Sequence, residues 1–305
     1  MTMVPRCAGT REPYRGAGGL RDGSGMFPVP SAPGRRRLAR LSVPVLLAAA
    51  IVLPTPVGAT EPLPDAATIS AAESAMIAAL NADRSAAGLV AVRTDSRLMA
   101  IARARSADMV ANDYFSHTQP DGRNVFDILT AQRITWYNAG EIIAWNNYPM
   151  DATTSAANHQ WMGSPGHKAI ILSTDLNYVG VGLAVDPDTG KKLWTAVFIK
   201  GPDRTGARAA VGTWSVGAGP TAATRRVRIP WAGSDVRLQV LTAGLHSFTV
   251  QRRVDGGAWA TTWASTTARA GYFTMYLGHR YEVRVSAVDN RGNRGAWVTT
   301  VVDLR

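Results

Sequence analysis

The residues whose types and spacing best suit binding or catalysis lie between His159 and Leu172. Two histidines, a tryptophan and a tight turn occur close together there. In the turn, Ser164-Pro165-Gly166, proline presets φ, glycine accepts positive φ, and serine can bond the backbone. The turn presents His167 just before a short apolar run, Ala169 to Leu172. A histidine held between a rigid turn and a short helix suits ligand binding or proton transfer. The sequence therefore predicts a polar cleft around His167.

Length and composition indicate a folded protein of two domains. The chain has 305 residues, of which 46% are apolar and 18% are charged. Its single cysteine, Cys7, lies in a segment that we expect to be removed. The mature protein would then have no disulfide, no thiolate metal site and no cysteine nucleophile, and its stability would come from packing.

The formal net charge of +11 is unevenly distributed along the chain. Residues 60–204 carry a net charge of −3, whereas residues 205–305 hold 13 basic and 5 acidic side chains, a net +8. Such asymmetry favours contact with an anionic surface, although a solvated face is the common alternative. The candidate basic face consists of five arginines: Arg225, Arg226, Arg228, Arg252 and Arg253.

Residues 1–59 are predicted to be a leader that contains a secretory signal peptide, with Met26 as a possible true start. Positive charges at Arg35 to Arg40 precede an apolar stretch of 13 residues, Leu41 to Leu53. A membrane span needs ~20 residues, so this stretch is too short. Val57-Gly58-Ala59 resembles a small-residue cleavage site. We expect a secreted, extracellular or cell-surface protein, with an uncleaved anchor as the alternative.

After a linker at residues 60–67, the pattern predicts an α+β domain over residues 68–200. Helices are expected from Thr68, from Thr94-Asp95, after Asp121-Gly122, with Phe126 and Leu129 buried, and over Thr153–Met162. Strands are expected over Tyr178–Val185 and Leu193–Ile199, joined by a hairpin loop at residues 186–190. Helices followed by an antiparallel pair indicate an α+β or α-β-α layered arrangement.

A second linker is expected at residues 201–210, and beyond it the apolar period changes to two. Asp255-Gly256-Gly257 marks a hairpin. Short alternating strands separated by turns predict an all-β sandwich over residues 211–305. Its expected core positions are Val227, Ile229, Trp231, Phe248, Val250, Phe273, Met275, Leu277, Tyr281, Val283, Val285 and Ala287.

Five stretches of residues 68–200 together resemble the CAP superfamily, in its bacterial, disulfide-free branch. This superfamily, also called the SCP domain, includes cysteine-rich secretory proteins, antigen 5 and pathogenesis-related proteins of class 1. The resemblance implies an α-β-α sandwich and an open cleft that gathers His117, Glu141 and His167. The stretches are Asn81-x-x-Arg84 with Gly88-Leu89, Asp113-Tyr114-Phe115-Ser116-His117-Thr118 with Pro120-Asp121-Gly122-Arg123, Ala139-Gly140-Glu141, Trp161-Met162-x-Ser164-Pro165-Gly166-His167, and Val179-Gly180-Val181-Gly182.

Three positions depart from the pattern of that superfamily. Ile142 and Ile170 stand where asparagine is frequent, and Ser164 stands where eukaryotic members often have a second acidic residue. These departures make the implied cleft less polar and less acidic, which weakens the case for a metal.

The last domain resembles a fibronectin type III module. The match is to its penultimate strand, and it implies that Tyr281 is a tyrosine-corner residue. The matching residues are Tyr281, Val283, Arg284, Val285, Ala287, Asp289, Gly292 and Asn293, with Leu277 upstream.

His117, Glu141 and His167 lie 24 and 26 residues apart, so only the fold can bring them together. Two imidazoles and a carboxylate can bind Zn²⁺ or another divalent cation, with water in the open position. Without a metal, Glu141 could orient one histidine as a general base. In the alternative interpretation, Glu141 bridges the two histidines and only braces the cleft.

The absence of several catalytic motifs argues against several enzyme classes. The sequence has no HExxH helix, nucleophile elbow or phosphate loop. Ser164 lies three residues from His167 in a turn, without an oxyanion-hole motif, which argues against a serine hydrolase. We expect His159 on the surface and Trp161 in the core. Four aromatic residues near Glu141 could bind a sugar or a lipid chain, or could pack the loops: Trp136, Tyr137, Trp145 and Tyr148.

We expect a secreted binding protein rather than an enzyme. Its His/Glu cleft would hold a divalent cation or a small ligand, such as a lipid or glycan, and its basic β module would attach to a cell-wall or surface polymer. The main alternative is a metal-dependent hydrolase of peptide or cell-wall polymer that uses the same three residues; a structural, protein-binding factor is a third hypothesis. We expect a monomer, no specific nucleic acid partner, and membrane contact only through the leader or a bound lipid.

Overall fold

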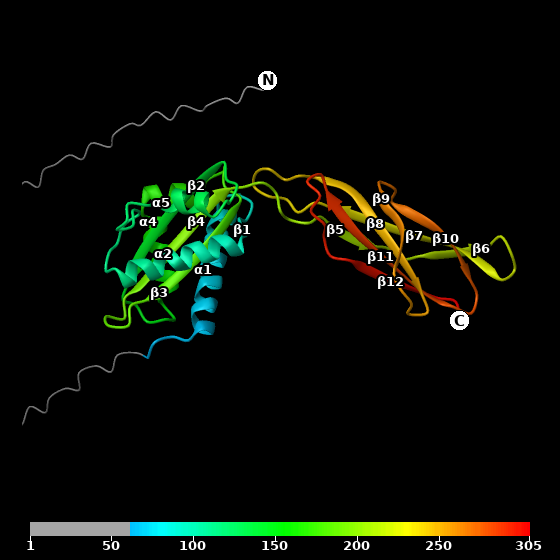
Figure 1. Ribbon diagram of the computed structural model, residues 1–305, viewed down its shortest axis with the longest axis horizontal. Helices are drawn as coiled ribbons and strands as arrows, with labels where there is room; N and C mark the ends of the chain where they lie inside the picture. Colours follow the sequence, from blue (N-terminus) through cyan, green and yellow to red (C-terminus); the bar gives the residue numbers. More distant parts are fainter. Residues whose placement is uncertain (1–61) are drawn as a thin grey trace, which may run out of the picture. The chain divides into compact units, whose positions relative to one another are not determined.

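A computed structural model describes residues 62–305, so the predicted leader and its cleavage site lie outside the described residues (Figure 1). The helices in this part of the chain are α1 (Ala66–Ala86), α2 (Ser96–Ala111), α3 (Val125–Ala131), α4 (Thr153–Gly163) and α5 (Pro165–Ile171). The strands are β1 (Arg93–Thr94), β2 (Asn138–Asn146), β3 (Tyr178–Val185), β4 (Lys192–Lys200), β5 (Arg208–Val211), β6 (Ser215–Ala218), β7 (Thr224–Ser234), β8 (Leu245–Val254), β9 (Ala260–Thr266), β10 (Ala270–Tyr276), β11 (Arg280–Asp289) and β12 (Val298–Asp303).

Helices α1, α2 and α3 begin where the sequence offers capping side chains. The carboxylates of Asp65 and Asp95 accept backbone N–H bonds at the starts of α1 and α2, and Asn124 forms a capping box with Asp127 at α3. The predicted burial within α3 is wrong at one position. Phe126 is 40% exposed, and Val125 is buried in its place because the helix turns that residue toward the sheet.

The first sheet has the strand order β1-β3-β4-β2 and separates two layers of helices. One core contains side chains of α1, α4 and α5 together with Val179 and Val181 of β3. A second core joins α2 and α3 to the opposite face of the sheet, where Val197 of β4 lies. The α-β-α arrangement is therefore present, because alternate residues of each strand point to opposite helical layers.

Two glycines of β3 allow α2 to lie directly on the sheet. A Cβ atom built on Gly180 would lie 2.1 Å from the carbonyl carbon of Leu98, and one on Gly182 would lie 2.2 Å from that of Ala102. Both distances are far below van der Waals contact. The sequence Val179-Gly180-Val181-Gly182 therefore packs valines against one helical layer and the backbone of α2 against the other.

The C-terminal all-β region contains two antiparallel sheets. β5, β7 and β10 lie in one, with β6 also paired to β7, and the other has the order β12-β11-β8-β9. The predicted alternation is confirmed at most positions, but Leu277 is 40% exposed because β10 ends at Tyr276. The Tyr281 hydroxyl accepts a hydrogen bond from the backbone N–H of Tyr276, as expected of a tyrosine corner. β5 begins at Arg208, inside the stretch predicted to be a linker.

The five arginines of the predicted basic face do not share one face. Arg226 and Arg228 are exposed on β7, whereas Arg252 and Arg253 belong to β8 in the other sheet. Arg225 donates hydrogen bonds to the backbone carbonyls of Ala222 and Thr224. The prediction grouped these arginines because β7 and β8 are consecutive strands in the sequence, but the two strands belong to different sheets.

Replacement of Gly180 by alanine should strongly destabilise the first domain. The new methyl group would meet the backbone of α2, which cannot rotate away as a side chain can, so the cost should reach or exceed the ~3 kcal/mol upper range of overpacking. Urea unfolding of the variant and wild type measures this change. Gly163→Ala is the control, because nothing lies within 4 Å of the position that its Cβ atom would take. Equal midpoints for Gly180→Ala and wild type would contradict the proposed close packing.

Candidate functional site

The three candidate residues come from three different elements. Glu141 lies in the middle of β2, paired with Val197 of β4. His117 lies in the loop between α2 and α3, which is closed by a bridge between Thr118 and Asn124. The third residue, His167, lies in the first turn of α5. β2 was not predicted as a strand from the sequence, so the rigid support of Glu141 is new information from the structure.

The Glu141 carboxylate is buried and fully engaged. Its side chain is only 2% exposed. Oε1 accepts a hydrogen bond from Arg105 Nε at 2.8 Å, and Oε2 lies 2.8 Å from His117 Nδ1. Oε2 also lies 3.4 Å from Arg105 Nη2. Glu141 therefore braces a histidine, as the alternative interpretation predicted, but its second partner is an arginine and not His167.

Arg105 is the functional residue that sequence reasoning missed. Its guanidinium is buried and also donates hydrogen bonds to the Tyr114 hydroxyl at 2.7 Å and to the Ser116 carbonyl at 2.8 Å. Burial by itself lowers the pKa of Arg105, but the ion pair with Glu141 outweighs burial and the net shift is upward. A signal was present, because Arg105 occupies the same helical stripe as Ile101 and Met109.

The loop that carries His117 is tied to α2 by a polar network. Tyr114 donates a hydrogen bond to Asp108, and Gln119 Nε2 donates to the same carboxylate at 2.9 Å. Burial, followed by the Asp108 contact, raises the pKa of Tyr114 to about 12, so the phenol stays protonated and donates. The Ser116 hydroxyl accepts a hydrogen bond from the backbone N–H of Thr118. His117 is thus presented by a rigid loop.

The two histidines have different surroundings. The His117 side chain is 54% exposed, and we assign its proton to Nδ1 because the partner there is a carboxylate, which leaves Nε2 free to accept. His167 is half-buried. Burial, and next the charge of His117, hold the pKa of His167 below its usual 6.5, so it is neutral at pH 7.

The three candidates line two hollows. His117 and Glu141 border a pocket of about 250 Å³ with Phe126, Gly140 and Ile170. His167 borders an open cleft of about 510 Å³. The other residues around this cleft are mostly aromatic or amide side chains: Phe115, Ile143, Ala144, Trp145, Asn146, Asn147, Tyr148, Gln160, Trp161 and Ser164. Ile170, which stands where asparagine is frequent, packs against Gly140 and lines the smaller pocket.

The donor set around Glu141 fits a divalent cation poorly. Both carboxylate oxygens already face donors, and one of these is a buried guanidinium that a cation would repel. Cation binding at Glu141 would require the carboxylate to leave Arg105 and strand that charge. Zinc binding by His117, Glu141 and His167 thus stays a prediction from the sequence.

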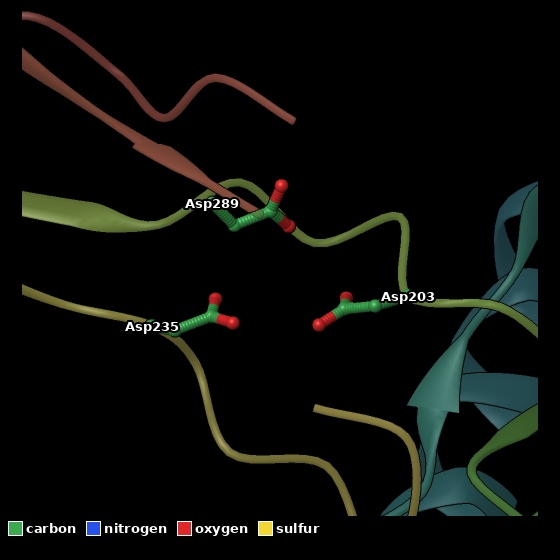
Figure 2. Close-up of side chains that lie close together, drawn as sticks. All are labelled: Asp203, Asp235 and Asp289. Atoms are coloured by element: carbon green, nitrogen blue, oxygen red, sulfur yellow. The ribbon is translucent and has the colours of Figure 1, made fainter. Parts of the chain in front are cut away.

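Three aspartates outside the candidate site lie closer together than His117, Glu141 and His167 do. Among residues 62–305, the acids whose oxygens all lie within 4.8 Å of one another are Asp203, Asp235 and Asp289 (Figure 2). Each accepts backbone N–H bonds, for example Asp203 from Ala243 and Asp235 from Gly244. This cluster was not predicted from the sequence because its members are 32 and 54 residues apart and belong to separate segments, with Asp289 at the end of β11.

A comparison with known protein families identifies the region that contains His117, Glu141 and His167. Residues 77–198 match the sequence profile of CAP, the cysteine-rich secretory protein family. Residues 77–198 are a CAP domain. The helices and sheet described above are therefore a CAP fold, and His117, Glu141 and His167 lie within it. The profile ends before the all-β region, whose fibronectin type III character stays a prediction.

The matches between this chain and its relatives cover only part of each chain. Uncharacterized protein YkwD of Bacillus subtilis strain 168 is 33% identical over 132 residues, which is 43% of this chain and 48% of that protein. Uncharacterized membrane protein YlbC of the same strain is 32% identical over 113 residues, 37% of this chain and 30% of that protein. A crystal structure of an extracellular protein containing a SCP domain from Bacillus anthracis has 27% identity and a TM-score of 0.40, and the match covers 46% of this chain and 45% of that one. This chain thus spans less than half the length of both B. subtilis relatives.

Removal of the guanidinium should destabilise the CAP domain. Arg105→Met leaves the Glu141 charge buried without its partner, which lowers the free energy of unfolding by about 3–5 kcal/mol. The double variant Arg105→Met, Glu141→Gln should recover part of this loss. Arg97→Met is the control, because the exposed Arg97 pairs with Asp95 at the surface and should contribute about 1 kcal/mol or less. Urea unfolding that shows equal losses for Arg105→Met and Arg97→Met would contradict this assignment.

His167 should titrate below pH 6.5 in the folded protein. Because its folded pKa is depressed, its stabilising contribution is present above pH 6.5 and is lost as the pH falls through the folded pKa. In His117→Gln, the pKa should rise only partly, since burial is the larger cause. NMR titration of the ring protons measures both values. A His167 pKa at or above 6.5 in the wild type would contradict the expectation.

Proposed function

We propose that the CAP domain is an extracellular binding module whose open cleft beside His167 holds a small glycan. The observation that carries this proposal is the exposure of aromatic side chains on the cleft. Phe115, Trp145 and Tyr148 are 42%, 44% and 55% exposed, although each borders the same hollow. Aromatic rings of this kind stack on the apolar faces of sugars, and the neighbouring amides can bind hydroxyl groups.

Polar groups at the cleft support a neutral, hydroxyl-rich ligand. The indole Nε1–H of Trp161 is buried and has no acceptor among residues 62–305, although Trp161 borders the cleft. His167 is neutral at pH 7 and can either donate or accept. The exposed amide of Gln160 adds a further donor and acceptor at the cleft. A ligand hydroxyl group could therefore pair with the His167 ring and with the Gln160 amide.

The proposal also includes secretion of the protein and a role for the C-terminal β module in attachment. The predicted signal peptide supports secretion, and none of the helices among residues 62–305 combines the length and apolar character needed to cross a bilayer. The net charge of +8 over residues 205–305 supports attachment of the β module, with its fibronectin type III-like pattern, to an anionic cell-wall or surface polymer.

One observation favours the hydrolase alternative. The carboxylate of Glu141 orients His117 through Nδ1 and leaves Nε2 on an exposed ring, which is the arrangement a general base needs. The pair requires no metal to act in this way. Loss of peptide or cell-wall hydrolysis in His117→Ala, with unchanged glycan affinity, would support this alternative, and absence of hydrolysis by the wild type would exclude it.

Calorimetric titration with an N-acetylglucosamine tetrasaccharide tests the glycan proposal. Trp145→Ala combined with Tyr148→Ala should weaken binding about tenfold, since each stacked ring contributes about 0.5–1.5 kcal/mol. Tyr137→Ala is the matched control, because Tyr137 is 57% exposed but does not border the cleft. No heat from the wild type, or equal affinity in the double variant, would contradict the proposal.

A parallel titration with Zn²⁺ tests the cation prediction. Heat that disappears in both His117→Ala and His167→Ala would establish a metal site. No heat from the wild type would remove zinc from the function.

A further inference from the structure

The arginines of the C-terminal region lie on two sheets whose outer faces have different chemistry. Strands β6, β7 and β10 lie side by side in one sheet and contain no aspartate or glutamate (Figure 1). Their outward positions include Arg226 and Arg228 on β7 and Tyr272 and Tyr276 on β10. Arg228 is directly paired with Tyr272 across the two strands. Cationic and aromatic side chains therefore lie together on strands without acidic residues, and this surface is here called the Arg–Tyr face.

The side chains of the Arg–Tyr face are available to a partner. Tyr272 and Tyr276 are 56% and 60% exposed, although both are large aromatic residues. The Arg226 guanidinium lies 4.7 Å from the centre of the Tyr272 ring and covers part of it, but the residue is still 56% exposed. Within residues 62–305, neither Arg226 nor Arg228 forms an ion pair with a carboxylate. Both charges thus remain uncompensated next to exposed rings.

On the outer face of the other sheet, the arginines and aromatic residues contact one another. Arg284 lies 4.1 Å from the Trp259 ring and 4.5 Å from the Trp297 ring, so it is held between them. Arg253 covers Trp259 from 4.6 Å, and Arg294 lies 5.6 Å from Trp297. This stack leaves the indole faces covered, and two of the arginines of that sheet bind one acid: Arg253 and Arg280 both pair with Glu282.

We propose that the Arg–Tyr face binds an acidic polysaccharide. This inference rests on the proposed attachment role and assigns it to one surface and one class of polymer. Tyr272 and Tyr276 are four residues apart on one strand, which places them about 13 Å apart, so one extended chain can reach both. Sugar rings stack on the phenols, and the carboxylate or phosphate groups between them bind Arg226 and Arg228.

The required chemistry has both a charged and an apolar part. A polyanion without rings would use only the arginines, and a neutral glycan would use only the tyrosines. The combination of exposed phenols and unpaired guanidiniums therefore favours a polymer that carries sugars and acids together. Nucleic acid also carries both rings and charges, and it is a separate outcome of the test below.

The experiment measures binding of the full secreted chain to polygalacturonate, its methyl-esterified form, inorganic polyphosphate and single-stranded DNA by biolayer interferometry at low salt. Tyr272→Ala with Tyr276→Ala should weaken polygalacturonate binding about tenfold and leave polyphosphate binding unchanged. Arg226→Ala with Arg228→Ala should weaken both at least tenfold. The esterified polymer should bind at least tenfold more weakly than the acid form.

A matched variant separates a defined face from general electrostatics. Arg237→Ala with Arg291→Ala removes the same charge from exposed positions outside the Arg–Tyr face and should change polygalacturonate binding less than threefold. Equal losses in the two arginine pairs, or unchanged binding in the tyrosine pair, would overturn the proposal. Tighter binding of DNA than of polygalacturonate would also overturn it. Thermal unfolding confirms that each variant is folded.

Sedimentation with purified bacterial cell walls distinguishes this inference from the attachment role itself. If the wild type does not sediment with walls, the attachment role fails. If the wild type sediments and the tyrosine pair sediments equally, attachment stands but uses another surface. Loss of sedimentation in the tyrosine and arginine pairs, with retention in the control pair, supports both.

Discussion

The candidate site depends on the buried ion pair between Arg105 and Glu141. A carboxylate in the middle of a buried strand is unfavourable unless it is paired and hydrogen-bonded. Arg105 meets that requirement from α2 and, with the remaining N–H groups, holds the loop that carries His117. The pair thus connects a helix, a strand and a loop of the CAP domain, and it sets the direction of the His117 ring.

This pairing also determines which groups remain for a ligand. Because Glu141 is engaged by Arg105 and His117, its charge serves the architecture, and the chemistry of the open cleft comes from His167 and the exposed aromatic residues. The C-terminal region repeats the contrast between engaged and available groups. Arg284 is held between Trp259 and Trp297, whereas Tyr272 keeps an exposed ring. In both parts of the chain, internal pairing therefore separates the groups that are engaged within the protein from the groups that are available to the proposed ligands.

Much of the fold followed from local patterns, and the errors have specific causes. The start of α2 was predicted because its cap, Asp95, forms a local side-chain bond, whereas α1 begins at Ala66, two residues before its predicted start. β2 was missed because most of its residues are buried on both faces, which removes the alternation that marks a strand. Arg105 was passed over because a charge on an apolar stripe is an exception to the helical pattern. Its buried partner lies 36 residues away, where no periodicity could reveal it.

The sequence by itself determined many of the helices and strands, the order of an α+β region followed by an all-β region, the resemblance to the CAP superfamily and the candidate residues His117, Glu141 and His167. These depend on hydrophobic period, turn chemistry and motif order, which are properties of short segments. Only the tertiary structure decided that Glu141 pairs with Arg105, that His167 borders a different hollow from His117, and that the arginines of β7 and β8 lie on different sheets. Such contacts join distant segments, and their geometry depends on how whole layers pack.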